Sequence, residues 1–492
     1  MNSRLSHQQA DAGAYFDKKS VKRLALLLVS SLAISIQAGR ADTTLLAIKG
    51  ATLLDVRNGR HIENSVILVE KDRIKEVGDA STIVIPTDAR LIDARGKWVI
   101  PGLVDMHVHG SSRKDVPIAL YVANGITAIR DMGGNITSLR MTRQKIESGE
   151  TLGPHLFYTG NVLDGSPPAV PPMSFIVDSP QEAKGAVEFL ISQGADSIKI
   201  YNNITEPVLD AIVKVAKRAG KPVGGHVPKA MSLRRSIELG FNFVEHSAIR
   251  GRDLLEWNVI TQAEANEITS LRSVTQREAL VWQRVDLGSP KVKEVISFMA
   301  VQNVFLDPTL SIDEFDSLFL YEKEAKHPNN RYLKRAFVDE ALGPDHDIFR
   351  MPAELKPLAV TGIEKRRKFV GMCNRARVKI LAGTDGPGIG RLTIGFGLHH
   401  ELALLVEAGL KPIEALQAAT INAARALRKE SEIGSLEPGK FADMVILNSD
   451  PLSDIHNTTK IDAVLLRGRM FDRTALDAML AEMEVEAKND VH

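Results

Sequence analysis

Short apolar strands alternate with helices between residues 104 and 428, and this rhythm constrains the fold more than any other feature of the sequence. Repeated strand–helix–strand units imply a parallel sheet with right-handed crossovers. About eight such units fit into the segment, which predicts an α/β fold of the (β/α)8 TIM-barrel type. Strands are expected at 125–131, 195–201, 221–226, 241–246, 303–310 and 378–385.

Two helices of this segment carry clear local signals. Ser179 and Glu182 have the spacing of a capping box, with Pro180 between them at the first helical position, and predict a helix over 179–194. Residues 206–220 place their apolar side chains on one face of a 3.6-residue period. Both helices are therefore expected to pack against the sheet.

The segments on either side of the barrel have a different character. Residues 45–100 and 430–472 are rich in β-branched residues and turns, as short strands are. We expect the two segments to form one small β-sandwich domain, so that the chain leaves it, builds the barrel and returns. The predicted division is a signal peptide at 1–41, β-sandwich parts at 42–103 and 429–473, the barrel at 104–428, and a C-terminal helix and tail at 474–492.

Two connections, at about 247–300 and 311–377, are too long for simple crossovers. Both follow predicted strands and so would lie on the C-terminal rim, where the active sites of barrels form. We expect them to form helical lids over the site.

Composition and charge narrow the class of partner. The chain has 492 residues, of which 44% are hydrophobic and 25% charged, as is ordinary for a globular protein. Its formal net charge of +1 gives no support for nucleic-acid or membrane-surface binding. The single cysteine, Cys373, excludes an intrachain disulfide. We expect a small-molecule substrate and no nucleic acid, and a homo-oligomer is compatible with the sequence.

The N-terminal residues have the pattern of a secretory signal peptide. The basic run at 18–23 precedes the apolar run at 24–36, and small residues follow, including Ala38 and Ala41. The apolar run is shorter than the about 20 residues that a membrane-spanning helix needs. We therefore expect cleavage, no membrane span afterwards, and a periplasmic or secreted mature protein.

Two histidines follow the first apolar strand of the barrel in the stretch "DMHVHG". Residues i and i+2 of a strand point to the same face, so His107 and His109 would present two imidazoles side by side. That geometry suits a metal ion, although surface histidines can share this spacing.

Further polar residues stand at or near the carboxyl ends of other predicted strands. In a closed barrel these ends converge on one mouth. The set is His107, His109, Lys199, His226, His246 and Asp385.

These side chains suit two divalent metal ions. Imidazole and carboxylate are ligands of zinc, which we expect here, and also of manganese, iron, cobalt and nickel. His107, His109 and Asp385 would hold one ion, and His226 and His246 the other. Lys199 could bridge the two ions if carbon dioxide adds to its neutral amine to give a carbamate, and burial favours the neutral amine.

The motifs around these residues resemble those of the amidohydrolase superfamily, in the imidazolonepropionase-like and Xaa-Pro-dipeptidase-like branch that has a carboxylated lysine. The resemblance runs from about residue 45 to residue 472. It is carried by "GKWVIPGLVDMHVHG", "SIKIY", "GGHVP", "FVEHSA" and "LAGTDGPG", and by the closing segments "LHHELALLVEAGLKPIEALQAATINAARAL" and "GSLEPGKFADMVILNSDPLSDI". It implies the barrel, the split β-sandwich and the six metal ligands together.

The expected activity is hydrolysis of C–N bonds in dipeptides, N-acyl amino acids or cyclic amides. Hydroxide generated at the metals would attack the carbonyl carbon, and Asp385 would take the proton and pass it to the leaving amine. Hydrolysis of phosphotriesters or lactones at the same site is an alternative, and a barrel that serves as a non-catalytic scaffold is another.

Other polar residues receive weaker assignments. Tyr201 could support the oxyanion of the reaction, or be a packing residue of the rim. Arg130 and Asp131 are interpreted as a buried ion pair, and Glu401 as a helix residue that is not a ligand. Structural or exposed roles are assigned to His155, His399 and His400.

Overall fold

The computed structural model describes most of the chain beyond the N-terminal residues. The described residues are 45–246, 251–255, 274–312, 314, 321–342, 352–387, 392 and 394–489. The predicted signal peptide and parts of both predicted lids lie outside them. Among the described residues, none of the helices combines the length and the apolar character that crossing a membrane requires.

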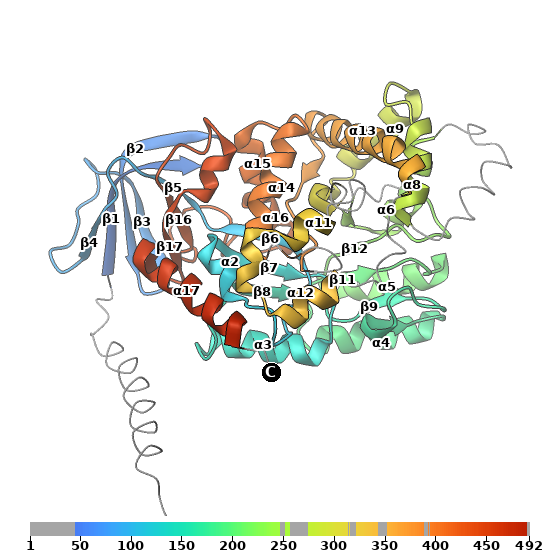
Figure 1. Ribbon diagram of the computed structural model, residues 1–492, viewed down its shortest axis with the longest axis horizontal. Coiled ribbons are helices and arrows are strands. Elements are labelled where there is room, and N and C mark those ends of the chain that lie inside the picture. The colour runs from blue at the N-terminus through green and yellow to red at the C-terminus, as the bar shows by residue number, and fades with distance from the viewer. Residues whose placement is uncertain are drawn as a thin grey trace, which may run out of the picture. The chain divides into compact units, whose positions relative to one another are not determined.

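A mainly antiparallel sheet is built from the two flanking segments (Figure 1). Its order is β18-β17-β16-β5-β1-β2-β3, with β4 paired to β1. Strand β16 lies antiparallel to β5, with Met444 opposite Pro101, and so joins the late segment to the early one. These strands form one sheet, and the two-layer sandwich expected from the sequence stays a prediction. The strands are β1 (Leu45–Asp55), β2 (Arg60–Glu70), β3 (Arg73–Asp79), β4 (Arg90–Asp93), β5 (Trp98–Pro101), β16 (Met444–Leu447), β17 (Ile461–Leu466) and β18 (Arg469–Asp472).

Parallel strands occupy the central part of the chain. One sheet has the order β6-β7-β8, and the other has the order β10-β9-β11-β12-β13-β14-β15. They comprise β6 (Leu103–Val108), β7 (Ile126–Asp131), β8 (His155–Tyr158), β9 (Val162–Asp164), β10 (Ser174–Ile176), β11 (Ile198–Ile200), β12 (Val223–Gly225), β13 (Phe243–Glu245), β14 (Phe305–Asp307) and β15 (Lys379–Ile380). The short strands β9 and β10 were not expected from the sequence.

Backbone hydrogen bonds link the two parallel sheets at both seams. The Met106 N–H donates to the carbonyl of Ala382 at 2.9 Å, and the Asp385 N–H donates to the carbonyl of His107 at 2.7 Å. At the other seam the Asp196 N–H donates to the carbonyl of Tyr158 at 2.8 Å. The arrangement is therefore a TIM-barrel-like α/β fold, as the alternation of strands and helices predicts.

Helices follow most of the parallel strands, as this fold requires (Figure 1). Helix α4 begins with the predicted capping box, because Ser179 Oγ accepts from the Glu182 N–H at 3.3 Å and Glu182 Oε2 accepts from the Ser179 N–H at 3.0 Å. Helix α5 buries Val208, Ile212 and Ala216, which belong to its predicted apolar face. The helices are α2 (Ala119–Ala123), α3 (Ile136–Glu147), α4 (Pro180–Ser192), α5 (Glu206–Arg218), α6 (Leu233–Leu239), α14 (Phe396–Glu407), α15 (Pro412–Ala418) and α16 (Ile421–Leu427).

The described parts of the two long connections are helical, as expected. Helix α12 packs on the loop that follows β6: Arg113 forms an ion pair with Glu340 at 2.8 Å and lies over the Phe337 ring. This contact places part of the second connection at the carboxyl end of the first barrel strand. The elements are η3 (Gly251–Leu254), α8 (Val274–Arg284), α9 (Pro290–Val301), α11 (Tyr321–Ala325), η4 (Pro328–Tyr332), α12 (Arg335–Ala341), η6 (Ala353–Leu355) and α13 (Lys356–Arg375); the last helix of the chain is α17 (Arg473–Asn489).

Gly102 occupies the joint between the antiparallel sheet and the first barrel strand. Its N–H donates to the carbonyl of Asp443 at 2.9 Å. A Cβ at this position would lie 2.1 Å from Oγ1 of Thr127 on β7. No side chain fits there unless β7 moves, so this glycine lets β6 lie close against its neighbour.

We predict that Gly102→Ala destabilises the protein by about 1–3 kcal/mol, the usual range for overpacking a buried site. Gly185→Ala is the matched control, because a Cβ there meets nothing within 4 Å on the exposed side of α4. It should stabilise the helix by about 0.5–1 kcal/mol. Urea unfolding curves of both variants would measure the two changes, and equal stabilities would contradict this account of the joint.

Candidate metal centre

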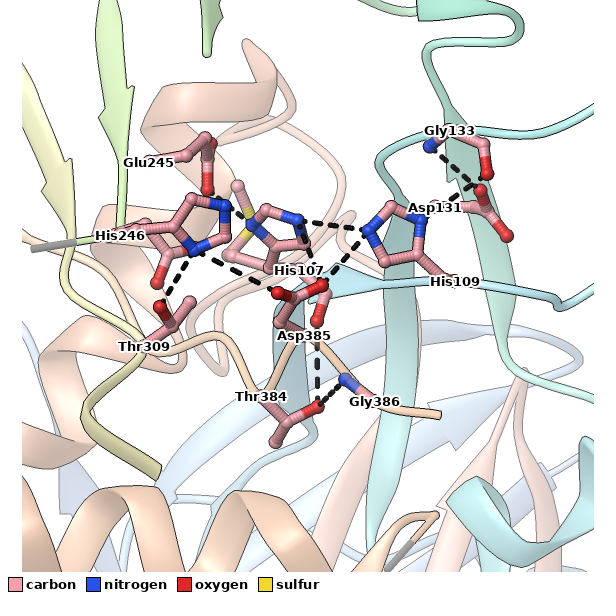
Figure 2. A network of polar contacts seen from close by, with 12 residues as sticks. His107, His109, Asp131, Gly133, Glu245, His246, Thr309, Thr384, Asp385 and Gly386 are labelled. Carbon is pink, nitrogen blue, oxygen red and sulfur yellow. Dashed lines mark hydrogen bonds and ion pairs between the residues drawn. The ribbon is translucent and has the colours of Figure 1, made fainter. Parts of the chain in front are cut away.

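All six side chains predicted to bind metal lie at the carboxyl ends of parallel strands. His107 is in β6 and Lys199 is in β11. The other four stand directly after or close behind a strand: His109 after β6, His226 after β12, His246 after β13 and Asp385 behind β15. In Figure 2 the imidazoles of His107, His109 and His246 and the carboxylate of Asp385 point toward one another.

The first predicted group of ligands is assembled around Asp385. Its Oδ1 lies 2.9 Å from Nε2 of His109 and 3.5 Å from Nε2 of His107. The two Nε2 atoms are 3.3 Å apart. Asp385 adopts a left-handed backbone conformation with φ of 52°, which is uncommon for a residue other than glycine. The fold thus holds this carboxylate at the histidines in a backbone conformation that is costly.

The second predicted group adjoins the first. The ring centroid of His246 lies 4.8 Å from that of His226 and 4.8 Å from that of His107. Asp385 Oδ2 is 3.9 Å from Nδ1 of His246. Ligand atoms of His107, His246 and Asp385 all fall within 4.8 Å of one another. The two groups therefore share one mouth.

The outer hydrogen bonds of the histidines determine which nitrogen faces the mouth. Nδ1 of His107 lies 2.6 Å from Oε2 of Glu245, and Nδ1 of His109 lies 3.3 Å from the carbonyl of Gly133. Both partners are acceptors, so each Nδ1 carries a proton and each Nε2 is directed at the mouth. Two unprotonated Nε2 atoms at 3.3 Å would repel each other, so a cation or a proton is needed beside them. This arrangement fits a metal ion.

His226 has a similar outer contact. Its Nδ1 lies 3.2 Å from Oδ1 of Asn202. Its ring stacks on the ring of Tyr201, with centroids 4.1 Å apart. Tyr201 is therefore at the rim of the site, and its part in oxyanion binding stays a prediction.

Burial keeps most of these histidines in the form that binds metal. It lowers the pKa of His107, His226 and His246 well below the usual value, so these imidazoles are neutral at pH 7. Burial is also the largest single influence on His109 and acts to lower its pKa, but the hydrogen bond with Asp385 and the negative charges of Asp385 and Asp131 together raise that pKa. A divalent cation would take the place of this proton.

Lys199 is a fully buried lysine beneath the histidines. Its relative exposure is 1%, and burial lowers the pKa of its amine to about 8, although the carboxylates of Glu245 and Asp385 act in the opposite direction. Gly225 on β12 makes room for it, because a Cβ there would lie 2.9 Å from Cδ of Lys199. This glycine therefore allows close packing against the lysine side chain.

Sequence reasoning missed a buried charge cluster behind His107. Arg130 donates to Glu245 Oε1 at 2.6 Å and to the carbonyl of Met106 at 2.7 Å, and it lies 3.8 Å from Oδ2 of Asp307. All three charged side chains have at most 1% exposure. The partners of Arg130 are thus two carboxylates on β13 and β14, which the sequence places more than a hundred residues away.

The structure also gives the partners of Asp131 and of the histidines that were assigned structural or exposed roles. Asp131 is not the partner of Arg130: its carboxylate accepts from the N–H groups of Ser111 and Gly133 at 3.0 and 3.1 Å. The histidines that were assigned structural or exposed roles have partners outside the candidate site. His155 pairs with Asp443, His399 lies between Thr458 and the carbonyl of Asn124, and His400 pairs with Glu314.

Comparisons with known proteins agree with this geometry. Residues 98–471 match the amidohydrolase family. An imidazolonepropionase of Geobacillus kaustophilus is 25% identical over 79% of this chain and 84% of its own length. An adenine deaminase of Moorella thermoacetica is 22% identical over 87% of this chain, but the match spans only 57% of the deaminase. The chain thus covers little more than half of such relatives.

Solved structures share the fold. A Xaa-Pro dipeptidase with methionine bound in its active site superposes with a TM-score of 0.62 at 23% identity, covering 87% of this chain and all of that one. A bottromycin amidohydrolase superposes with a TM-score of 0.70 at 21% identity, covering 92% of each chain. At these identities the likeness concerns the fold.

We predict that Glu245→Gln weakens metal binding about 10–100-fold, because the amide supplies one acceptor where His107 and Arg130 now use two carboxylate oxygens. Competition with a chelator would measure the zinc dissociation constant. Glu238→Gln, on the exposed side of α6, is the control and should bind zinc as the wild type does. Equal affinities for both variants would refute a role for Glu245 in orienting His107.

Proposed function

Because this chain belongs to the amidohydrolase family, we propose that it is a metal-dependent hydrolase that cleaves C–N bonds in small molecules. We take its parallel strands as one closed (β/α)8 barrel with the catalytic site at the carboxyl ends of the strands. The convergence of His107, His109 and Asp385 at hydrogen-bonding distance carries this proposal most directly.

The proposed centre holds two divalent ions. His107, His109 and Asp385 would hold one ion, and His226 and His246 the other. Zinc is the expected metal because imidazole and carboxylate are its usual ligands, and manganese, iron, cobalt and nickel accept the same donors. The support from the chain is the set of imidazoles that burial keeps neutral, those of His107, His226 and His246, and the 3.3 Å between the Nε2 atoms of His107 and His109.

A carbamate on Lys199 would connect the two halves of the centre. Carbon dioxide adds only to a neutral amine, and a pKa of about 8 leaves part of the Lys199 amine neutral near pH 7. The resulting carbamate would bring two anionic oxygens into a mouth that would otherwise hold two cations and one carboxylate.

The residues of the chain suggest how the reaction proceeds. Divalent ions bound there would lower the pKa of a water molecule and polarise the scissile carbonyl. Asp385, with both oxygens at the mouth, would accept the proton of the attacking water and donate it to the leaving amine, which leaves poorly without it. Tyr201 at the rim would donate a hydrogen bond to the oxyanion.

The proposed substrates are dipeptides, N-acyl amino acids and cyclic amides. The family resemblance supports amide chemistry, and the fold likeness to a dipeptidase and an amidohydrolase is compatible with it. We further propose a periplasmic or secreted location, which rests on the basic and apolar runs at 18–36.

A library of dipeptides, including Xaa-Pro members, together with N-acyl amino acids and cyclic amides, tests this function. The protein from Asp42 onward would be loaded with zinc and bicarbonate, and released amines would be quantified by mass spectrometry. We expect release from one subset. Silence across the library with two metals bound would contradict amide hydrolysis and favour lactones or phosphotriesters. Silence with no metal bound would favour a scaffold.

Asp385→Ala should lower turnover of the responsive substrate by at least about 100-fold, the usual contribution of a positioned acid–base group. Metal content must be measured in the same samples, because the aspartate is also a proposed ligand. Asp477→Ala, on exposed α17, is the control. Turnover of Asp385→Ala within tenfold of wild type would exclude the proposed proton transfer.

A further inference from the structure

The backbone directly after β14 is held in an unfavourable conformation beside the proposed metal centre. Thr309 is 1% exposed and has a φ of 44°, in the left-handed region that β-branched residues avoid. Such a conformation costs about 1–3 kcal/mol and persists only when neighbouring groups enforce it. Two sets of contacts accompany this conformation, one with His246 and one with Glu401.

The first contact joins Thr309 to a proposed metal ligand. Thr309 Oγ1 lies 2.9 Å from Nδ1 of His246. Figure 2 shows that this nitrogen contacts both the hydroxyl of Thr309 and, at 3.9 Å, the carboxylate of Asp385. His246 itself has a φ of 63°, so both partners are held in unusual backbone conformations. A hydrogen bond to one ring nitrogen of a ligand histidine fixes the orientation of its ring.

The contact that enforces the conformation comes from helix α14. Oε1 of Glu401 accepts from the Leu310 N–H at 2.8 Å, and Oε2 accepts from the Ser311 N–H at 2.8 Å. The two oxygens therefore form hydrogen bonds with the amides of the two residues that directly follow Thr309. A further hydrogen bond runs from Ser311 Oγ to the carbonyl of Thr384 at 3.4 Å, beside Asp385. The segment is thus fixed at the amides by Glu401.

Packing alone does not explain a carboxylate at this position. Glu401 has no exposure, and burying an unpaired carboxylate is costly, so an apolar side chain would serve a purely structural helix face better. The sequence had suggested a helix residue without a ligand role. Both oxygens of Glu401 accept from backbone N–H groups of the segment that carries Thr309.

We propose that Glu401 is a positioning residue of the metal centre. Its carboxylate fixes the amides of Leu310 and Ser311, and thereby holds the Thr309 hydroxyl against His246. The inference rests on the proposed function, since it takes His246 as a metal ligand. Glu401→Gln replaces one acceptor oxygen with an NH2 group that faces an N–H donor, so one of the two contacts is lost.

Cobalt reports on this effect, because its visible absorption spectrum depends on the geometry of its ligands. The full protein would be loaded with Co²⁺, and the spectrum and the cobalt dissociation constant measured. We expect Glu401→Gln to alter the spectrum and to weaken binding about tenfold. Glu407→Gln is the matched control on the same helix, because its side chain is 56% exposed and pairs with Arg367. It should leave both readouts at wild-type values.

A double-mutant cycle tests the route through Thr309. Thr309→Val keeps the shape of the side chain and removes the hydroxyl that contacts His246. If Glu401 acts through this hydroxyl, the Glu401→Gln and Thr309→Val effects on cobalt affinity will be less than additive. Glu401→Asp keeps the charge but has a shorter side chain, and it is the variant to use if Glu401→Gln does not fold. We expect it to change the cobalt spectrum and affinity less than the loss of one contact would.

The inference is overturned if Glu401→Gln lowers the unfolding temperature but leaves the cobalt spectrum and affinity unchanged. Full additivity with Thr309→Val would also overturn it, because the two side chains would then act independently. A wild-type protein that binds no cobalt would instead overturn the proposed function and this inference with it. The three results are distinguishable in one set of titrations.

Discussion

The convergence of His107, His109 and Asp385 on one mouth places the strictest demand on this fold. The Nε2 atoms of His107 and His109 stand 3.3 Å apart, and a carboxylate oxygen of Asp385 lies 2.9 Å from that of His109. Where little water can screen these polar atoms, they need a shared proton or a cation to lie so close together. The outer hydrogen bonds to Glu245 and Gly133 hold the two rings in place, so the fold keeps the three groups at these distances.

The scaffold supplies this restraint from outside the mouth. The charge cluster of Arg130, Glu245 and Asp307, with side chains on three different strands, holds His107 through Glu245. Glu401 holds the segment after β14, and through Thr309 it acts on His246. Both devices bury charge, and both are arranged so that a histidine ring has one orientation. Burying these charges costs stability, and the result is that the histidine rings are held in one orientation.

Local patterns in the sequence were enough to select the candidate ligands, because each pattern depends on neighbours a few residues away. The i, i+2 spacing of His107 and His109, and the capping box that starts α4, are signals of this kind. The partners of Arg130 could not be predicted, because they depend on which strands lie across the barrel interior. The same holds for Glu401, whose partners lie ninety residues earlier in the chain. Strands β9 and β10 were missed because the proline-rich segment between them interrupts the alternation of strand and helix by which the other short strands were found.

The metal content of the purified protein shows whether the six side chains form a centre for two ions. Wild-type protein and Lys199→Ala would be prepared with zinc and bicarbonate, dialysed, and analysed by inductively coupled plasma mass spectrometry. The account predicts two metal ions per wild-type chain and loss of metal from Lys199→Ala, with partial recovery when a short-chain carboxylic acid is added. A folded wild-type protein without stoichiometric metal would contradict the account. So would a Lys199→Ala variant that keeps both ions.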